Sequence, residues 1–539
     1  MAFKLILEGK RCLLVDDFSE FRYSVKKMLQ SLGATDVDDT GDGDEAIDKI
    51  ALKAYDLILC DYNLGENKRD GQQILEESKH KEILKYSAIF IMITAENTMR
   101  MVMGAMEYKP DDYLTKPFTK EALLARLEKI MEKKNDFATI DKALARKDYH
   151  GALKLCNEKI QTKPKNLYEL LKLKAELSIT VGDYAEAESI YNQIVNIRRL
   201  PWALLGLGKA LFLSTKYMEA KEIFLEIIDE NRSFVEAYDW LAKVLEALGD
   251  PKEAQRMLMR ALELSPKAIL RQKALADIAY KNNDLATAEN SYKQAVDLGK
   301  NSCFKSAKDY TGLAQVMLDK KTPDKALKIL QESKTTFTND RESNLQATLM
   351  QGLAHKDLGN ETELKGAIEE ANSLFSGMKG TINSEASLDI AGSFFKLGEN
   401  DKASQIMQEV IRNNHDNEKV LKKAQDIFTS ADMTTEGEKM IAATKREIIK
   451  VNNDGVMLVK NGKLAEAIDF FEKAAVGLPE NKIINANAAQ ALLMYMQKFG
   501  KTDKHINQVQ RYLDQIRKVD PTYKKYQELV VVYKKLTEA

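Results

Sequence analysis

Short apolar runs alternate with amphipathic stretches over residues 10 to about 133. The runs cover 12–15, 57–60, 88–93 and 112–114, and a weaker one covers 35–38. Between them, apolar residues repeat with a helical period over 21–32, 45–52, 72–81, 99–108 and 119–133. Unbroken apolar runs are typical of parallel strands that helices cover on both faces. The alternation therefore predicts an α/β domain whose doubly wound parallel sheet has five strands and five helices.

A second pattern begins at about residue 138, where the strand signal stops and a helical period continues through turns rich in Gly, Asn and Asp. An alanine recurs at the same place in successive repeats, and the first four spacings between these alanines are 35, 33, 34 and 34 residues. Its positions are Ala152, Ala187, Ala220, Ala254, Ala288, Ala326, Ala403 and Ala467. Neighbouring helices approach closely where a small residue faces a large one, and each helix pair can bury its outer face on the next pair. The period predicts an all-α array of stacked helix pairs.

Other positions keep the register of this alanine. A proline stands twelve residues after it at Pro164, Pro266 and Pro479, where a helix should end. Leu207-Gly208 and Leu241-Ala242 give the large-then-small pair of a first helix in two repeats. A bulky side chain stands four residues after the alanine, and we expect it to be core, at Tyr191, Phe224, Leu258, Tyr292 and Phe471.

Composition supports an ordered, multidomain chain. Its 539 residues are 44% hydrophobic and 30% charged, with only nine prolines. We expect no membrane span, because no stretch of 18 apolar residues occurs, and the first residues make a poor secretory signal. A cytoplasmic location is therefore expected. The five histidines share no metal spacing and are predicted to be surface or turn residues. Four cysteines form no C-x-x-C pair and are predicted to be reduced core thiols: Cys12, Cys60, Cys156 and Cys303.

The net charge of −1 is an average of two unlike regions. Residues 1–133 carry 20 basic and 25 acidic side chains, and the rest of the chain carries 61 and 57. The helical region is too mildly basic for non-specific nucleic-acid binding to be expected. Opposite net charges suggest a complementary contact between the two regions, which salt or phosphorylation would weaken.

Candidate chemistry lies at the ends of the predicted strands. Asp16 and Asp17 follow the first apolar run and Asp61 follows the third, so all three carboxylates should meet at the carboxyl-end crevice of the sheet. Converging carboxylates repel one another, and a hard divalent cation relieves that conflict. Mg²⁺ suits a site that must also hold phosphate. Thr94 and Lys116 end the fourth and fifth runs and should project into the same crevice.

Four motifs occur in order on these strands and resemble the receiver domain of bacterial response regulators of the chemotaxis type, a flavodoxin-like fold. They are V-D-D at 15–17, L-C-D-Y-N at 59–63, I-T-A at 93–95 and D-Y-L-T-K-P-F at 112–118. The resemblance implies that Asp61 is the phosphoacceptor. It also implies that Asp17, Asp61 and the main-chain carbonyl of Asn63 bind Mg²⁺, with Asp16 acting nearby or through water.

The same resemblance gives the remaining pocket residues their roles. Lys116 would contact one phosphoryl oxygen and Thr94 would hydrogen-bond another. Tyr113 matches the aromatic residue that turns inward when that threonine moves. The change would be relayed to the surface around the fourth helix, the fifth strand and the fifth helix. Two departures stand out: a long polar loop, Y-N-L-G-E-N-K-R-D-G, follows Asp61, and Lys109-Pro110 stands where the family commonly has Gly-Ala.

The helical region resembles the tetratricopeptide repeat. We expect a receiver domain over 1–135 and a tetratricopeptide-repeat superhelix over 136–539. The repeats are clearest over 138–300 and 448–480, divergent over 330–450, and followed by a helical cap over 500–539. In such arrays partners bind the concave face made by the first helices, where Lys209 and Lys243 are candidates for gripping an acidic peptide or carboxylate.

Two function classes follow. In the first, a sensor histidine kinase or phosphotransfer protein phosphorylates Asp61, and the receiver changes what the repeats bind or how two chains pair through the receiver. In the second, the chain is a scaffold or chaperone-like assembly protein that uses the receiver as a docking module or phosphate sink. An enzymatic output beyond the receiver's own phosphorylation and dephosphorylation is not expected, since we find no nucleotide loop or nucleophile motif after residue 138.

Overall fold

The structure is a computed structural model of the whole chain, and it describes residues 6–65, 68–95, 109–134, 137–162, 164–378, 382–520 and 523–538. The helix predicted over 99–108 lies outside these residues. The chain forms two compact units, Met1–Lys320 and Lys321–Ala539. The first unit therefore contains both the α/β fold and the first helical repeats, so the change of fold class near residue 135 does not coincide with the division into units.

Five parallel strands form one sheet in the order β2-β1-β3-β4-β5. The strands are β1 (Arg11–Val15), β2 (Asp36–Thr40), β3 (Leu57–Asp61), β4 (Ile89–Thr94) and β5 (Asp112–Thr115). This order confirms the predicted flavodoxin-like doubly wound sheet. The weakest predicted run became the edge strand β2, whose sequence D-V-D-D-T leaves all but its last residue partly exposed. An edge strand needs less apolar surface, which explains its faint signal.

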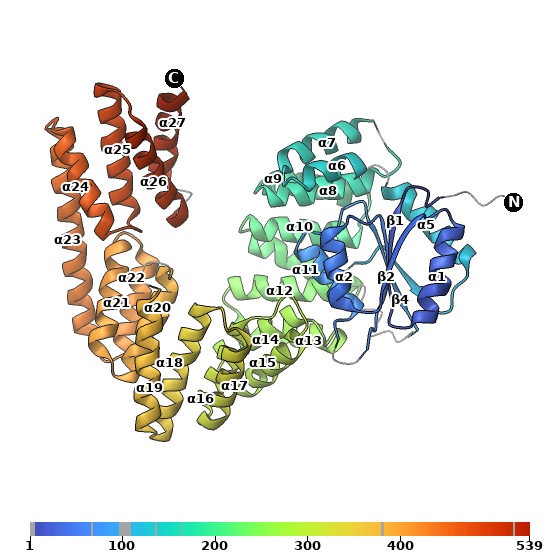
Figure 1. The fold of residues 1–539 in the computed structure, drawn as a ribbon, viewed down its shortest axis with the longest axis horizontal. Helices are drawn as coiled ribbons and strands as arrows, with labels where there is room; N and C mark the ends of the chain where they lie inside the picture. Colours follow the sequence, from blue (N-terminus) through green and yellow to red (C-terminus); the bar gives the residue numbers. More distant parts are fainter. Residues whose placement is uncertain are drawn as a thin grey trace. The chain divides into compact units, whose positions relative to one another are not determined.

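Helices cover both faces of the sheet (Figure 1). One face packs against α1 (Ser19–Ser31) and α5 (Lys120–Lys134), with Cys12 and Leu14 of β1 pointing toward them. The other face packs against α2 (Gly43–Leu52) and α3 (Gly71–His80), toward which Leu13 and Val15 point. Because successive strand residues point to opposite faces, both halves of each apolar run are used.

The rest of the first unit is a series of antiparallel helices that contact mainly their neighbours in sequence. They are α6 (Ala138–Leu144), α7 (Tyr149–Gln161), α8 (Leu167–Thr180), α9 (Tyr184–Ile197), α10 (Pro201–Leu213), α11 (Tyr217–Glu230), α12 (Val235–Ala247), α13 (Pro251–Leu264), α14 (Ile269–Lys281), α15 (Leu285–Gly299) and α16 (Ala307–Asp319). We call α6, α8, α10, α12, α14 and α16 the first helices of their pairs. The first-helix face is the surface made by these helices and the loops that lead into them.

The second unit continues with the same kind of element. Its helices are α17 (Pro323–Thr336), α18 (Arg341–Leu358), α19 (Glu361–Ser376), α20 (Ser384–Leu397), α21 (Asn400–Asn413), α22 (Glu418–Ser430), α23 (Thr434–Lys460), α24 (Leu464–Gly477), α25 (Lys482–Phe499), α26 (Asp503–Val519) and α27 (Lys524–Glu538). At 27 residues, α23 is about twice as long as a usual repeat helix. It begins inside the stretch that we predicted to diverge from the repeat.

The recurring alanines explain how the helix pairs stack. All eight are fully buried, and each lies in the second helix of its pair. The bulky residue four positions later is buried in each of its five repeats. Glycines in the first helices make room for these rings: a Cβ added at Gly206 would lie 2.3 Å from the ring of Tyr191 in α9, and one at Gly208 would lie 2.6 Å from Phe224 in α11. The predicted small-against-large packing is confirmed.

Two of the turns between the helices of a pair have the same backbone conformation. Gly182 and Gly249 have φ values of 84° and 82°, in the left-handed region that glycine enters without strain. The aspartate after each glycine caps the next helix, because the side chains of Asp183 and Asp250 accept hydrogen bonds from the backbone N–H groups of Glu186 and Glu253. The G-D pair in the sequence is thus a helix stop followed by a helix start.

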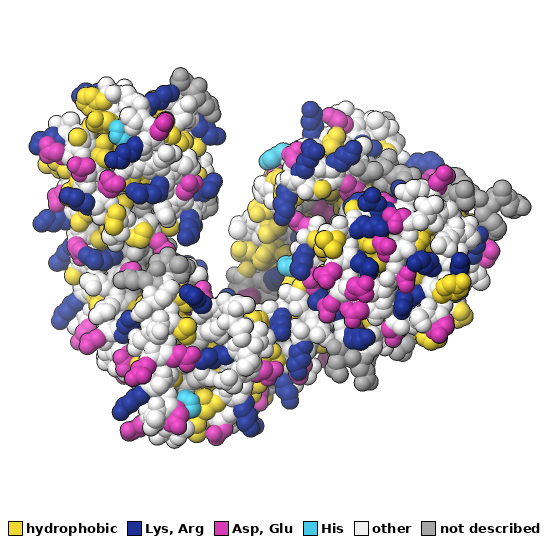
Figure 2. All heavy atoms as spheres, viewed as in Figure 1, with side chains coloured by type: hydrophobic (Ala, Val, Ile, Leu, Met, Phe, Trp, Pro, Cys, Tyr) yellow, Lys and Arg dark blue, Asp and Glu magenta, His cyan; other side chains and the backbone are white. Residues whose placement is uncertain are grey.

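Surface charges are mixed by sign. Figure 2 shows Lys and Arg side chains among Asp and Glu side chains over the visible face of both units. Many pair between helices, such as Lys174 with Glu186 at 2.6 Å and Lys216 with Glu188 at 2.9 Å. Among the described residues, no helix is both long and apolar enough to cross a membrane.

Two residue types depart in part from their predictions. Cys12, Cys60 and Cys156 are buried free thiols, as predicted, whereas Cys303 is only half-buried in the loop before α16. His415 lies in a turn, as predicted, but it is 8% exposed, and the Asn481 side chain donates a hydrogen bond to its Nδ1 over 3.0 Å. A turn residue can be buried where another helix covers the turn.

Candidate functional site

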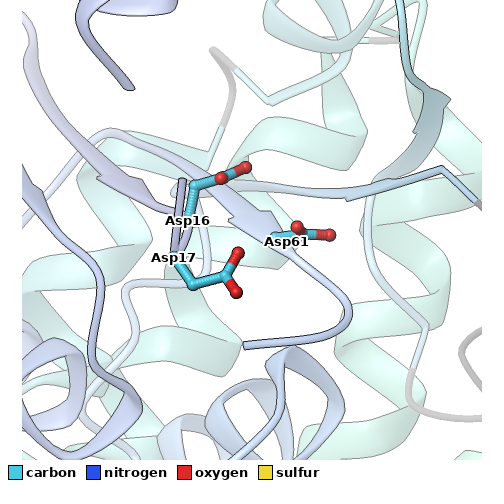
Figure 3. A group of neighbouring side chains, drawn as sticks. All are labelled: Asp16, Asp17 and Asp61. Carbon is cyan, nitrogen blue, oxygen red and sulfur yellow. The ribbon is translucent and has the colours of Figure 1, made fainter. Parts of the chain in front are cut away.

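The three predicted carboxylates converge at the carboxyl ends of two neighbouring strands. Asp16 and Asp17 follow β1 directly, and Asp61 is the last residue of β3 (Figure 3). One carboxylate oxygen from each lies within 4.8 Å of the others. Asp16 is fully buried and Asp61 is 7% exposed, while Asp17 is exposed. Side chains so close, and of one sign, form a site for positive charge.

Lys116 supplies the positive charge in this structure. Its Nζ lies 2.5 Å from Oδ2 of Asp16 and 2.6 Å from Oδ2 of Asp61, and it donates a hydrogen bond to each. The same Nζ lies 4.3 Å from the centre of the Phe21 ring, whose face favours a cation. The carboxyl ends of β1 and β3 are thereby tied to the residue that follows β5. One ammonium against three carboxylates still leaves the pocket negative.

Burial and charge shift the pKa values in opposite directions. Burial raises the pKa of Asp61, and it outweighs the hydrogen bond from Lys116; the charge of Asp16 adds to the rise, and a backbone N–H group of Asn63 opposes it. Burial alone would lower the pKa of Lys116, but its hydrogen bonds to Asp16 and Asp61 raise it overall. Lys116 is therefore held as a cation, and Asp61 gains from any further positive charge in the pocket.

The other predicted pocket residues border this cluster. Thr94 is 3% exposed at the end of β4, and its main-chain carbonyl accepts a hydrogen bond of 2.8 Å from the N–H group of Lys116. Tyr113 on β5 is half-buried and packs against the apolar cluster shared with α2 and α3. Asn63 is exposed, two residues past Asp61, and its side-chain oxygen accepts a hydrogen bond from Gly65.

The long loop after Asp61 is tied back to the sheet and to α3. The N–H group of Tyr62 donates to Ile93 over 2.8 Å, and that of Gly71 donates to Tyr62 over 3.0 Å. Arg69 pairs with Asp44 at 2.7 Å and also with Glu77. The departure from the usual short turn thus has its own set of contacts.

Sequence reasoning missed several residues at this site. The Arg22 guanidinium donates to the main-chain carbonyl of Asp16 over 2.6 Å and holds the end of β1. Phe21, the neighbour of Arg22, supplies the ring beside Lys116. Both lie in α1, four and five residues after Asp17, but one turn of a helix brings them over the strand end. That spacing was the available signal, and residue type alone does not reveal it.

Lys209 and Lys243 lie together on α10 and α12, as their repeat spacing predicted. Their Nζ atoms are 5.2 Å and 4.2 Å from the centre of the Trp240 ring. Lys209 is also paired with Glu236 at 2.5 Å. Burial lowers the pKa of Lys243. An acidic ligand for these lysines would therefore compete with Glu236.

An acidic crevice at the carboxyl ends of a doubly wound sheet, closed by one lysine and joined to stacked helix pairs, defines a signalling domain linked to a protein-binding array. The family model of the response regulator receiver domain matches residues 12–128, and that of the tetratricopeptide repeat matches 235–278. The chain belongs to the response regulator receiver family.

Individual relatives agree over the same region. The chemotaxis protein CheY of Pseudomonas aeruginosa is 31% identical over 125 residues, which are 23% of this chain and 98% of that protein. CheY-3 of Vibrio cholerae is 30% identical over 129 residues, 24% of this chain and 97% of that protein. The helical region is similar to a solved structure of MamA from Desulfovibrio magneticus RS-1, at 19% identity and a TM-score of 0.28, covering 31% of this chain and 94% of that one.

Proposed function

We propose that this chain is the response regulator of a phosphorelay. Asp61 takes a phosphoryl group from a sensor histidine kinase or phosphotransfer protein, and the modified receiver alters protein binding by the repeats. The observation that supports this most is the position of Lys116, which bridges Asp16 and Asp61 beside the third carboxylate of Asp17. A lysine in that place can leave the carboxylates and neutralise an incoming phosphoryl group.

The oxygen donors of the pocket fit Mg²⁺. Three carboxylate oxygens within 4.8 Å of one another are hard ligands of the kind this ion prefers, and Lys116 balances only part of their charge. Asp17, Asp61 and the main-chain carbonyl of Asn63 would hold the ion, with Asp16 nearby or through water. When bound, Mg²⁺ would lower the repulsion between Asp61 and the phosphoryl oxygens.

The chain's own residues would then divide the transfer step between them. A carboxylate oxygen of Asp61 forms the bond to phosphorus as the bond from phosphorus to the donor breaks. Lys116 donates to one transferred oxygen and the Thr94 hydroxyl donates to another. Thr94 and Tyr113 lie on adjacent strands, so a shift of Thr94 toward the phosphoryl group leaves space for Tyr113 to turn inward.

The repeat side of the proposal is protein recognition on the first-helix face, with Lys209 and Lys243 as the candidates for an acidic partner. Pairing of two chains through the receiver is a second way in which the modification could be read out. If the modification changes neither binding nor assembly, the scaffold or assembly function is favoured instead.

The test is labelling of the full chain with acetyl phosphate and Mg²⁺, followed on phosphate-affinity gels, with ¹⁹F NMR of bound beryllofluoride as the second readout. We expect a shifted band and a bound fluoride signal for the wild type, and neither for Asp61→Asn or after chelation of Mg²⁺. The matched control is Asp48→Asn, which changes an exposed aspartate on α2 and should behave as the wild type. Equal labelling of Asp61→Asn and wild type would exclude Asp61 as the acceptor.

A further inference from the structure

The helix that follows the acceptor loop is buried on more than its sheet-facing side. Seven of the ten residues of α3 are buried: Gly71, Gln72, Ile74, Leu75, Glu76, Glu77 and Ser78. Ile74 and Leu75 face the sheet. Gln72 and Glu76, at 7% and 6% exposed, are polar, and polar side chains on a helix at the surface of a domain are usually solvated. Their burial shows that something outside the sheet covers this side of α3.

The covering element includes the loop before α16. Gln72, Glu76 and His80 are spaced four residues apart and therefore share one stripe of α3. At its end, the His80 ring lies 4.7 Å from the ring of Phe304, centre to centre. Burial, and next the charge of Glu76, raise the pKa of Cys303, so Glu76 lies close to the residue before Phe304. We call Gln72, Glu76 and His80 the α3 stripe.

The contact extends from this loop along the first-helix face. Tyr86, in the loop between α3 and β4, packs into the apolar cluster that contains Leu173 and Leu177 of α8. The N–H group of Ser87 donates to the carboxylate of Asp141 in α6 over 3.3 Å. Receiver and repeats are thus joined at α6, at α8 and before α16.

An ion pair adds to these contacts. Lys109, which lies three residues before β5 and belongs to the Lys109-Pro110 departure from the family pattern, pairs with Glu236 of α12 at 2.7 Å. Burial raises the pKa of Asp70, and the charge of Lys267, just before α14, opposes that rise. The Lys109–Glu236 ion pair has the signs opposite to those of the predicted attraction, because the receiver supplies the lysine and the repeats supply the glutamate.

The α3 stripe is mechanically linked to the acceptor. The Tyr62 hydroxyl, one residue past Asp61, donates to Oε1 of Gln72 over 3.2 Å. The first residue of α3, Gly71, lies so close to the acceptor that an added Cβ would be 2.2 Å from the main-chain oxygen of Asp61. A movement of the backbone at Asp61 therefore pushes directly on the start of α3.

We propose that the α3 stripe, with Tyr86 and Lys109, is the output surface of this receiver, and that its binding partner is the first-helix face of the same chain. In this arrangement the receiver occupies the surface on which the repeats would hold a partner, and modification of Asp61 loosens it. The second part rests on the proposed function. The route runs through the acceptor loop and α3, whereas the family resemblance led us to expect the fourth helix, fifth strand and fifth helix.

Cys303 reports on this contact because it precedes Phe304, whose ring lies against that of His80, and because it is the one cysteine of the four that is not fully buried. The experiment measures its alkylation rate in the full chain by mass spectrometry. Lys109→Gln and Glu236→Gln should each raise the rate about two- to fivefold, the size expected for a partly exposed ion pair. Glu236→Gln also removes the pair with Lys209, so the double variant should react no faster than Glu236→Gln alone, in which the Lys109–Glu236 pair is already lost.

The controls separate loss of this pair from a general change of charge. Lys129→Gln and Glu222→Gln alter exposed residues on α5 and α11 and should leave the Cys303 rate at the wild-type value. Lys109→Arg should keep the slow rate, since it keeps the charge. Beryllofluoride with Mg²⁺ should raise the rate in the wild type and leave Asp61→Asn unchanged.

Each outcome tests a different part of the proposal. Additive effects of the two single variants, or no effect of either, would overturn the docked contact. A bound fluoride signal in ¹⁹F NMR without a change at Cys303 would overturn the coupling of this surface to Asp61, while the proposed phosphorylation stands. Absence of the bound signal would refute the proposed function itself and would leave the ion pair as a constitutive contact, which also overturns the coupling.

Discussion

The receiver pocket and the helical repeats bury polar groups in opposite ways. The pocket gathers full charges of one sign at the strand ends and balances them with Lys116. The repeats pair their buried charges one to one, as Arg271 with Asp239 and Asp309 with Lys273, and they bury neutral groups such as Asn481, which donates to Arg412 and His415. The pocket therefore keeps an excess of negative charge that a ligand can relieve, whereas the buried charges named in the repeats each have a partner of opposite sign. A change of one charge should therefore affect chemistry in the pocket, and a change of one shape should affect stability in the repeats.

Removing the pocket's cation is the change from which we expect the largest effect. Lys116→Met should slow the labelling of Asp61 by acetyl phosphate about 100-fold or more, the order of loss seen when one preorganised charge-stabilising donor is removed. Time courses on phosphate-affinity gels measure this. Lys129→Met, on the exposed side of α5, should label at the wild-type rate. Labelling of Lys116→Met within threefold of the wild type would show that the pocket does not depend on its lysine.

Adding one methyl group where two helices touch should have the next largest effect. Gly206→Ala places a Cβ 2.3 Å from the Tyr191 ring, and the repacking should lower the free energy of unfolding by about 1–3 kcal/mol. Urea unfolding of the full chain, followed by Trp fluorescence, measures it, since both tryptophans lie in the neighbouring helices α10 and α12.

A glycine without such a neighbour provides the comparison. Gly366, exposed within α19, has nothing within 4 Å of an added Cβ. Gly366→Ala should raise stability by about 0.5–1 kcal/mol, because alanine loses less backbone freedom in a helix. If both substitutions destabilise equally, close packing is not the reason that Gly206 is a glycine.

The smallest effect concerns the buried histidine of the second unit. Burial lowers the pKa of His415 below its ordinary value of 6.5, so the folded chain holds the ring neutral. The contribution of the neutral ring to the free energy of unfolding is then complete above pH 6.5. It falls as the pH decreases through the pKa of the histidine in the unfolded chain, by at most about 1.4 kcal/mol per pH unit for one proton. Thermal unfolding between pH 7.5 and 5 should show the loss. His415→Gln keeps an acceptor for Asn481 and should flatten the slope, and an unchanged slope would contradict the assignment.

The sequence predicted the sheet and the pocket because both depend on local pattern. Apolar runs end at Asp16 and Asp61, and parallel strands bring those ends together. The fully buried alanine, such as Ala187, was predictable for the same reason, since 34-residue spacing repeats one packing contact. What these patterns have in common is that each residue's role follows from its own element.

Roles that depend on a second element were not predictable. Gln72 and Glu76 fit an ordinary amphipathic helix, and nothing in the pattern of α3 indicates that they are buried. Lys209 was predicted to face a partner but already pairs with Glu236 from the next first helix. His415 carries no local sign of the Asn481 side chain that covers it.

The contacts between rings and glycines also determine where this chain can be cut and recombined. The ring of Tyr191 belongs to α9, yet the glycine that admits it, Gly206, belongs to the following pair. Phe224, in contrast, reaches Gly208 within its own pair. A graft that lifts out α10 and α11 together would keep the second match and lose the first. A graft that keeps both matches therefore begins in the middle of α9, before Tyr191, and ends after α11, so it does not begin at the turn that precedes α10.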